Sequence, residues 1–248
     1  MGRMSPVDLL AFGPHPDDLE IGMGGTLAHH AARGARVGLC DLTRGERGSN
    51  GTPDERVAEG EAASAVLGAA WRVNLGLPDG GLAIVPDQVR AIAAILRSAR
   101  PVIVAIPFER DRHPDHAAAH ALLVRAVFDA GLRRFEAPGE PWRPARVVSY
   151  FINDNTPPTF VVDVTAVYEV KRRALACYRT QFSAEGTGGV ATRLTSPLFA
   201  QLVESRDAQF GASAGVRFAE GFVARDPLLL ADLFAAAALE PPAVEPAR

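Results

Sequence analysis

The sequence lacks the features that mark several large classes of protein. It has only two cysteines, Cys40 and Cys177, which are too few for a disulfide framework and favour a reducing, cytoplasmic setting. The formal net charge is -3 and no basic run occurs, so nucleic-acid binding has no electrostatic support. No apolar stretch near the N-terminus reaches the length of a signal peptide or a membrane span, so we expect no membrane association.

The rest of the composition is that of a globular protein, with 48% hydrophobic and 22% charged residues among 248. A chain of this length can bury one sizeable core. Short apolar runs predict strands at 7–12, 36–42, 71–77, 102–107, 147–152 and 159–164. Apolar residues at helical spacing predict helices at about 19–33, 54–68, 86–99, 114–130, 166–181 and 196–210.

This alternation of strands and helices predicts an α/β fold with a doubly wound, mostly parallel sheet in a single domain. We expect the domain to span residues 1–248, with its core at about 7–232. The glycine-rich stretch 184–193 is expected to be a mobile loop, and the proline-rich tail from Glu240 is expected to be frayed.

Two polar motifs each follow a predicted strand. PHPDD at 14–18 follows strand 7–12, and HPDH at 113–116 follows strand 102–107. In an open α/β sheet, sites form outside the carboxyl ends of the strands, near the point where the strand order reverses. We therefore expect the two motifs to converge, although they lie far apart in the sequence.

The residue types in these motifs suit zinc. A catalytic zinc usually takes three protein ligands from His, Asp and Glu and leaves one position open. His15, Asp18 and His116 supply such a set, and two neutral imidazoles with one carboxylate leave a net positive centre that favours the ionisation of water. A set with two nitrogens and one oxygen also accepts Fe(II), Co(II) or Mn(II).

Asp17 and His113 are then left beside the expected ligands. Adjacent residues diverge, so Asp17 and Asp18 do not easily face the same metal, and a free carboxylate beside a catalytic metal is a natural general base. His113, protonated by pairing with Asp115, could steady the oxyanion of a tetrahedral intermediate or protonate a leaving amine.

Each motif also has a plainer interpretation. Asp17 or Asp18 would suit a helix cap near Leu19, and Pro114 with Asp115 would suit the first turn of a helix. The occurrence of both motifs, each at the end of a strand, favours a site.

The other histidines and the glycines carry weaker signals. His29 and His30 lie inside a predicted helix and are expected at the surface or in packing. His120 is expected to support the site or the core, because no glutamate completes an HExxH motif. GMGGT at 22–26 is not a GxGxxG motif, since Leu27 takes the last glycine position, and close helix–sheet packing explains its small residues better.

The segment 43–56 follows strand 36–42 at the same end of the predicted sheet. An arginine there would suit a substrate carboxylate through a bidentate contact, and a solvated loop charge is the alternative interpretation. The polar candidates in this segment and just before HPDH are Arg44, Arg47, Asn50, Arg56, Arg110 and Arg112.

These segments together resemble one family. AFGPHPDDLEIGMGGTLA, CDLTRGERGSNGTPDER, LPDGGL and ERDRHPDHAAA look like the motifs of the zinc-dependent LmbE/PIG-L-type deacetylases, from about Val7 to Asp232. YRTQF (178–182) and AEGFV (219–223) resemble the branch that deacetylates N-acetylglucosaminyl malate in bacillithiol synthesis. The resemblance implies a Rossmann-like sheet, zinc, a small N-acetyl sugar as substrate, and a homo-oligomer, commonly a hexamer in this branch.

The resemblance implies a role for each matching position. The implied roles are metal ligand for His15, Asp18 and His116, general base for Asp17, oxyanion-stabilising or acid residue for His113, and its orienting partner for Asp115. Arg56 matches a substrate-contacting arginine, and we expect Asn50 and Arg112 to join it in binding the substrate.

Two positions depart from the family pattern. Pro14 replaces the usual alanine and stiffens the loop without changing ligation. Phe199 stands where the branch often has a tyrosine, so a pocket hydrogen bond from that position is in doubt.

Several alternatives stay open. Within the family, the substrate could be a mycothiol precursor, a chitin fragment, or a thiol conjugate cleaved at an amide. In a different class, the chain would be a non-catalytic metal- or nucleotide-binding module.

Overall fold

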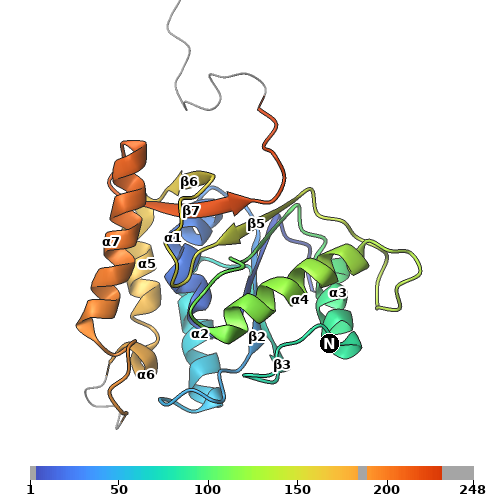
Figure 1. Cartoon of the computed structure of the whole chain (residues 1–248), viewed down its shortest axis with the longest axis horizontal. Coiled ribbons are helices and arrows are strands. Elements are labelled where there is room, and N and C mark those ends of the chain that lie inside the picture. The colour runs from blue at the N-terminus through green and yellow to red at the C-terminus, as the bar shows by residue number, and fades with distance from the viewer. Residues whose placement is uncertain (1–3, 184–188, 231–248) are drawn as a thin grey trace, which may run out of the picture.

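A seven-stranded sheet forms the centre of the computed structural model, which describes residues 4–183 and 189–230 (Figure 1). The strand order is β3-β2-β1-β4-β5-β7-β6. Strands β1 to β5 run parallel, whereas β7 is antiparallel to both β5 and β6. The strands are β1 (Leu9–Gly13), β2 (Val37–Thr43), β3 (Trp71–Leu77), β4 (Ile103–Pro107), β5 (Arg146–Tyr150), β6 (Phe160–Asp163) and β7 (Ala219–Ala224).

Helices cover both faces of this sheet (Figure 1). One face packs against α3 and α4, and the other against α1, α2, α5 and α7. The helices are α1 (Asp18–Ala32), α2 (Pro53–Leu67), α3 (Pro86–Ala99), α4 (Pro114–Ala130), α5 (Tyr168–Leu175), α6 (Arg179–Phe182) and α7 (Pro197–Ala214). A mostly parallel sheet with alternating helices confirms the predicted α/β fold.

The central strands are apolar along their whole length because both of their faces are covered. In β1, Leu10 and Phe12 join the core under α3 and α4, while Leu9 and Ala11 join the core under α1 and α2. Successive residues of a strand point to opposite faces, so a strand buried on both sides has no polar face. This explains why the motif-bearing strands are recognisable in the sequence as short apolar runs.

Helix α1 bends at Met23, whose φ of -149° and ψ of 22° are not helical. The bend leaves backbone N–H groups without helical hydrogen-bond partners, and a buried carboxylate satisfies them. Glu220 accepts the N–H groups of Gly25 (2.9 Å) and Thr26 (2.6 Å). Arg206 donates to the carbonyl of Ile21 at 2.7 Å on the other side of the bend. The short N-terminal part of α1, which carries Asp18, is therefore held by contacts from the C-terminal third of the described chain.

Two predictions about secondary structure were wrong or incomplete. Strand β7 was not predicted, because the charged Glu220 interrupts its apolar run; the side chain is 0% exposed and pairs with Lys171 Nζ at 2.6 Å. The predicted helix 166–181 is instead a 3₁₀ turn (Thr165–Val167), α5 and α6. The chain leaves helical geometry at Tyr178 (φ -85°, ψ 64°), and its ring is buried.

Parts of the predicted loop 184–193 and of the predicted core lie outside the described residues. These are positions 184–188, 231 and 232, and the tail from Glu240 lies there as well. Within residues 4–183 and 189–230, no helix is long and apolar enough to cross a membrane.

Candidate active site

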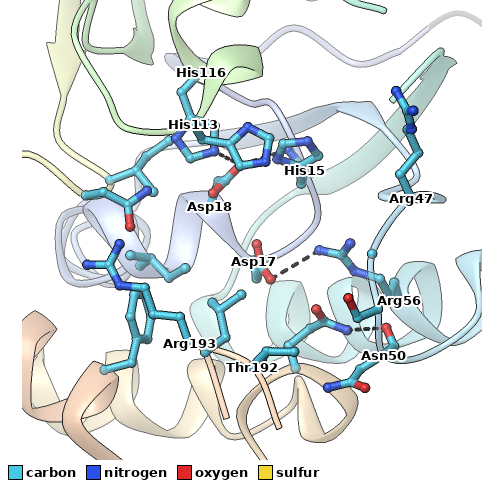
Figure 2. Close-up of a pocket in the computed structure, with 18 of the residues that line it drawn as sticks. His15, Asp17, Asp18, Arg47, Asn50, Arg56, His113, His116, Thr192 and Arg193 are labelled. Carbon is cyan, nitrogen blue, oxygen red and sulfur yellow. Dashed lines mark hydrogen bonds and ion pairs between the residues drawn. The ribbon is translucent and has the colours of Figure 1, made fainter. Parts of the chain in front are cut away.

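The two motifs meet at the carboxyl ends of β1 and β4, which are neighbours in the sheet. The strand order reverses at this pair, because β2 and β3 continue on one side and β5 on the other. This is the position at which open α/β sheets bind ligands. Figure 2 shows the imidazoles of His15, His113 and His116 grouped around the Asp18 carboxylate, with Asp17 directed toward Arg56.

Asp18 lies between the two imidazoles that we expect to bind metal. Its Oδ2 is 3.0 Å from His15 Nδ1 and 3.3 Å from His116 Nε2. A tetrahedral zinc with bonds of about 2.0–2.2 Å holds its ligand atoms roughly 3.3–3.6 Å apart, so these separations are close to what zinc needs. The donor set of two imidazoles and one buried carboxylate fits a divalent transition metal.

The arrangement also offers two other trios of donors, one of which is His15, Asp79 and Asp115. Donor atoms of His15, His113 and His116 all lie within 4.8 Å of one another, a group that does not contain Asp18. His113 is exposed, whereas the other two histidines are buried. The assignment of His15, Asp18 and His116 as the ligands stays a prediction.

Further carboxylates approach the far side of both imidazoles. Asp111 Oδ1 is 3.1 Å from His116 Nδ1, although the ring N–H is not aligned for a regular hydrogen bond. His15 Nε2 lies 3.3 Å from Asp79 Oδ1 and 3.4 Å from Asp115 Oδ2. Carboxylates in such positions orient metal-binding imidazoles and raise their basicity.

The protonation of these histidines follows from the surrounding charge. Burial lowers the pKa of His15, but the nearby carboxylates of Asp115, Asp18 and Asp79 outweigh burial and raise it well above the ordinary value. The pKa of His116 is raised to about 9, because the charge of Asp18 and the contact with Asp111 outweigh burial. Both imidazoles must lose a proton before they bind a metal, so metal binding is coupled to proton release.

The expected pairing of His113 with the Asp115 carboxylate does not form. His113 begins α4 as its N-cap, and its Nδ1 accepts the backbone N–H of Asp115 at 3.2 Å. The first helical turn directs the Asp115 carboxylate the other way, where it accepts the N–H of Gly80 at 2.7 Å and faces His15. Burial and the charge of His116 lower the pKa of His113, so its protonation by an Asp115 pair is corrected to a neutral ring.

Asp17 has the most unusual backbone in the site. Its φ of 114° lies in the left-handed region, which few non-glycine residues adopt and which is often found at functional sites. Its carboxylate is buried, and burial raises its pKa to about 7, while the charge of Arg56 acts in the opposite direction. A carboxylate with a pKa near neutral is well matched to accepting and returning a proton.

Arg56 of α2 holds Asp17 in place. The guanidinium donates to Pro16 O at 2.7 Å, to Gly45 O at 3.0 Å and to Asp17 Oδ2 at 3.2 Å. Gly45 permits this close approach: its φ is 65°, and a Cβ there would lie 1.9 Å from Arg56 Nη1. Arg56 lines the cavity, but most of its donors are engaged by the protein, so its expected contact with substrate stays a prediction.

Asn50 also lines the cavity while its side chain is engaged. Its amide donates to Val190 O at 2.9 Å and accepts the N–H of Val190 at 2.8 Å. Gln181 donates to the Asn50 carbonyl at 2.7 Å. Asn50 therefore fixes the wall of the cavity formed by the segment after residue 188, and its direct contact with substrate stays a prediction.

A cavity of about 280 Å³ opens beside these groups, and besides Arg56 three arginines that are candidates for substrate contacts line it. They are Arg47, Arg112 and Arg193. Within the described parts of the chain, neither Arg112 nor Arg193 forms an ion pair, and burial together with the charge of Arg112 lowers the pKa of Arg193. Phe199 contributes an apolar wall, with Arg193 over its ring at 5.6 Å.

The other polar candidates serve elsewhere. Arg44 pairs with Asp54, and Arg110 donates to Thr156 Oγ1 at 2.7 Å. His120 donates from Nδ1 to Pro107 O at 2.9 Å and so supports the end of β4, as predicted. Asp79, Asp111 and Arg193 were not predicted as site residues. Asp79 lies in LPDGGL and Asp111 just before HPDH, both within the segments that carried the resemblance, whereas Arg193 ends the glycine-rich stretch 184–193.

Comparison with known proteins places the chain in a family. Residues 10–127 match the family model "PIG-L: GlcNAc-PI de-N-acetylase". The diacetylchitobiose deacetylase of Thermococcus kodakarensis is 30% identical over 231 residues, which cover 86% of this chain and 81% of that protein. The 1D-myo-inositol 2-acetamido-2-deoxy-alpha-D-glucopyranoside deacetylase of Rhodococcus opacus is 30% identical, over 88% of this chain and 96% of that protein.

A solved structure agrees with these relatives. The crystal structure of the conserved protein TT1542 from Thermus thermophilus is 44% identical and superposes with a TM-score of 0.83. The match covers 90% of this chain and 97% of that one. By the family model, the deacetylase relatives and this shared structure, the chain belongs to the PIG-L deacetylase family.

Proposed function

We propose that this chain is a zinc-dependent deacetylase that hydrolyses the acetamide of N-acetylglucosaminyl malate, as the sequence resemblance implies. The observation that carries the choice of substrate is the pair Arg112 and Arg193, which line the cavity and form no ion pair within the described residues. Two neighbouring cations at the cavity wall favour an anionic ligand, and guanidinium groups bind carboxylates in bidentate fashion. Malate supplies two carboxylates, whereas an inositol or a second sugar supplies none.

Asp17 supplies the general base in this proposal. Its carboxylate takes a proton from the attacking water as the carbon–oxygen bond forms, and returns it to the nitrogen as the carbon–nitrogen bond breaks. The products are acetate and the free amine of the sugar. Burial raises the pKa of this carboxylate to about 7 in the metal-free site, and Arg56 keeps it in its strained position beside the expected metal ligands.

His113 supplies a hydrogen bond to the developing oxyanion. Because its Nδ1 accepts the backbone N–H of Asp115, the proton of the neutral ring is on Nε2. That N–H can donate to the amide oxygen as its negative charge grows, which is when such a donor stabilises most. His15, Asp18 and His116 would hold the metal, which supplies Lewis acidity toward the amide oxygen and acidifies water when it is bound.

A neutral N-acetyl sugar is the second candidate substrate. The two sequence relatives are deacetylases of diacetylchitobiose and of an inositol glycoside. Neither of those compounds carries a carboxylate for the arginine pair. The arginine pair alone would also suit the phosphates of a nucleotide. The deacetylase relatives favour hydrolysis of an N-acetyl sugar over nucleotide binding and over hydrolysis of a thiol conjugate.

An acetate-release assay distinguishes these substrates. The zinc-loaded protein is offered N-acetylglucosaminyl malate, diacetylchitobiose, the inositol glycoside and N-acetylglucosamine at equal concentrations. The proposal expects the malate glycoside to have the highest kcat/KM, and an equal or higher value for a neutral sugar would contradict it. A homo-oligomer, in the form of a hexamer, is part of the same proposal, and light scattering of the purified protein measures the assembly.

A further inference from the structure

Asp79 joins two parts of the site that come from different strands. It lies in the turn after β3 and lines the cavity, and its side chain is 8% exposed. The turn runs from Pro78 to Gly81, where the Gly81 N–H bonds to Pro78 O at 3.0 Å. Gly80 at the third position has a φ of 71°, as a type II turn requires. The turn thereby presents Asp79 to the end of β1.

The first contact of Asp79 is with an expected metal ligand. Its Oδ1 is 3.3 Å from His15 Nε2, within hydrogen-bond geometry, while the opposite ring nitrogen faces Asp18 at 3.0 Å. The Asp115 carboxylate is 3.4 Å from the same Nε2 but is not placed for a hydrogen bond, and it serves the N–H of Gly80. Asp79 is thus the acceptor that fixes the His15 ring and leaves Nδ1 for a metal.

The second contact of Asp79 is with the loop after β2. Its Oδ2 accepts the backbone N–H of Arg47 at 2.8 Å, and the Glu46 carboxylate accepts the N–H of Asp79 at 2.8 Å. These reciprocal bonds hold the start of the segment 44–50, which carries Asn50 and forms part of the cavity wall. One carboxylate therefore orients His15 with one oxygen and the cavity loop with the other.

We propose that Asp79 is a positioning residue that couples the orientation of the metal ligand His15 to that of the cavity loop 44–50. The inference rests on the proposed function, since it needs a metal at His15 and a substrate against the loop. Loss of the outer partner of a metal-binding imidazole typically weakens metal affinity about 10–100-fold. Loss of the loop contact acts separately, on substrate binding.

Two variants of Asp79 and one of Glu46 separate these effects. Zinc affinity is measured by competition with a chromophoric chelator, and kinetics are measured at saturating zinc. D79A is expected to bind zinc about 10–100-fold more weakly and to raise KM more than it lowers kcat. D79N keeps an oxygen that accepts from His15 Nε2 and is expected to recover most of the zinc affinity.

E46A is the matched control, because it removes the acceptor for the Asp79 N–H but leaves the contact with His15. It is expected to raise KM while zinc affinity stays at the wild-type value. D79A binding zinc as tightly as the wild type would overturn the inference, and so would an equal loss of zinc affinity in E46A. Absence of zinc binding by the wild type would instead overturn the proposed function, and thermal unfolding in a chelator shows that each variant is folded.

Discussion

Replacing Asp17 by asparagine should abolish most of the turnover while leaving the fold intact. Asparagine has the same size and tolerates the left-handed region, so the φ of 114° can be kept. The amide cannot accept a proton from water, and general bases contribute about 10²–10⁴-fold to rates. At about 1.4 kcal/mol per factor of ten, the barrier should rise by about 3–6 kcal/mol.

The same change should not destabilise the metal-free protein, and above neutral pH it should stabilise it. The folded-state pKa of Asp17 is about 7 against an ordinary value of 3.8, because burial disfavours the charged form. A pKa raised in the folded state means that the carboxylate contributes stability at low pH and loses it as the pH rises through 7. D17N removes that loss, which amounts to something on the order of 1–4 kcal/mol at alkaline pH.

Two measurements test this reasoning. Acetate release by zinc-loaded D17N gives kcat, and urea unfolding of the metal-free wild type and D17N at pH 5 and 8.5 gives the two stabilities. The zinc content of D17N, measured in parallel, tests whether the variant still binds the metal through Asp18. A kcat for D17N above one tenth of the wild-type value would refute the assignment of the base, and a lower stability of D17N at pH 8.5 would refute the account of its burial.

Three further changes probe the rest of the site. R112A should raise KM for the malate glycoside about 10–100-fold, as expected from losing a charge-assisted hydrogen bond worth about 1.5–3 kcal/mol, and should leave the kinetics with N-acetylglucosamine unchanged. D18A should weaken zinc affinity by more than the roughly 10–100-fold lost when a hydrogen-bond partner of a metal ligand is removed, and chelator competition measures this. G45A should lower the free energy of unfolding by about 1–3 kcal/mol, because its Cβ would displace Arg56 and its φ of 65° is strained, and urea unfolding measures this.

The position of the site was predictable because local signals agreed with the topology. PHPDD and HPDH follow short apolar strands, and parallel strands end at the same edge of the sheet. His15 and His116 could therefore be placed near one another from the sequence alone. The alternation of apolar runs and helical patterns likewise predicted the first four strands and the helices between them.

The contacts that refine the site were not predictable, because they join loops from different strands. Asp79 and Asp111 resemble surface acids in the sequence, and only the fold brings them to His15 and His116. The pairing of His113 with Asp115 was inferred from adjacency, but helical geometry turns those side chains apart. Strand β7 was missed for a related reason: Lys171, the partner that makes a buried Glu220 acceptable, lies on helix α5, far from β7 in the sequence.

The most direct test of the central claim is acetate release from N-acetylglucosaminyl malate by the zinc-loaded protein, compared with the same protein after treatment with a chelator. The account predicts release that requires the metal, returns when zinc is restored, and is faster than with any neutral N-acetyl sugar. Stoichiometric zinc binding without release of acetate from any of these sugars would contradict it.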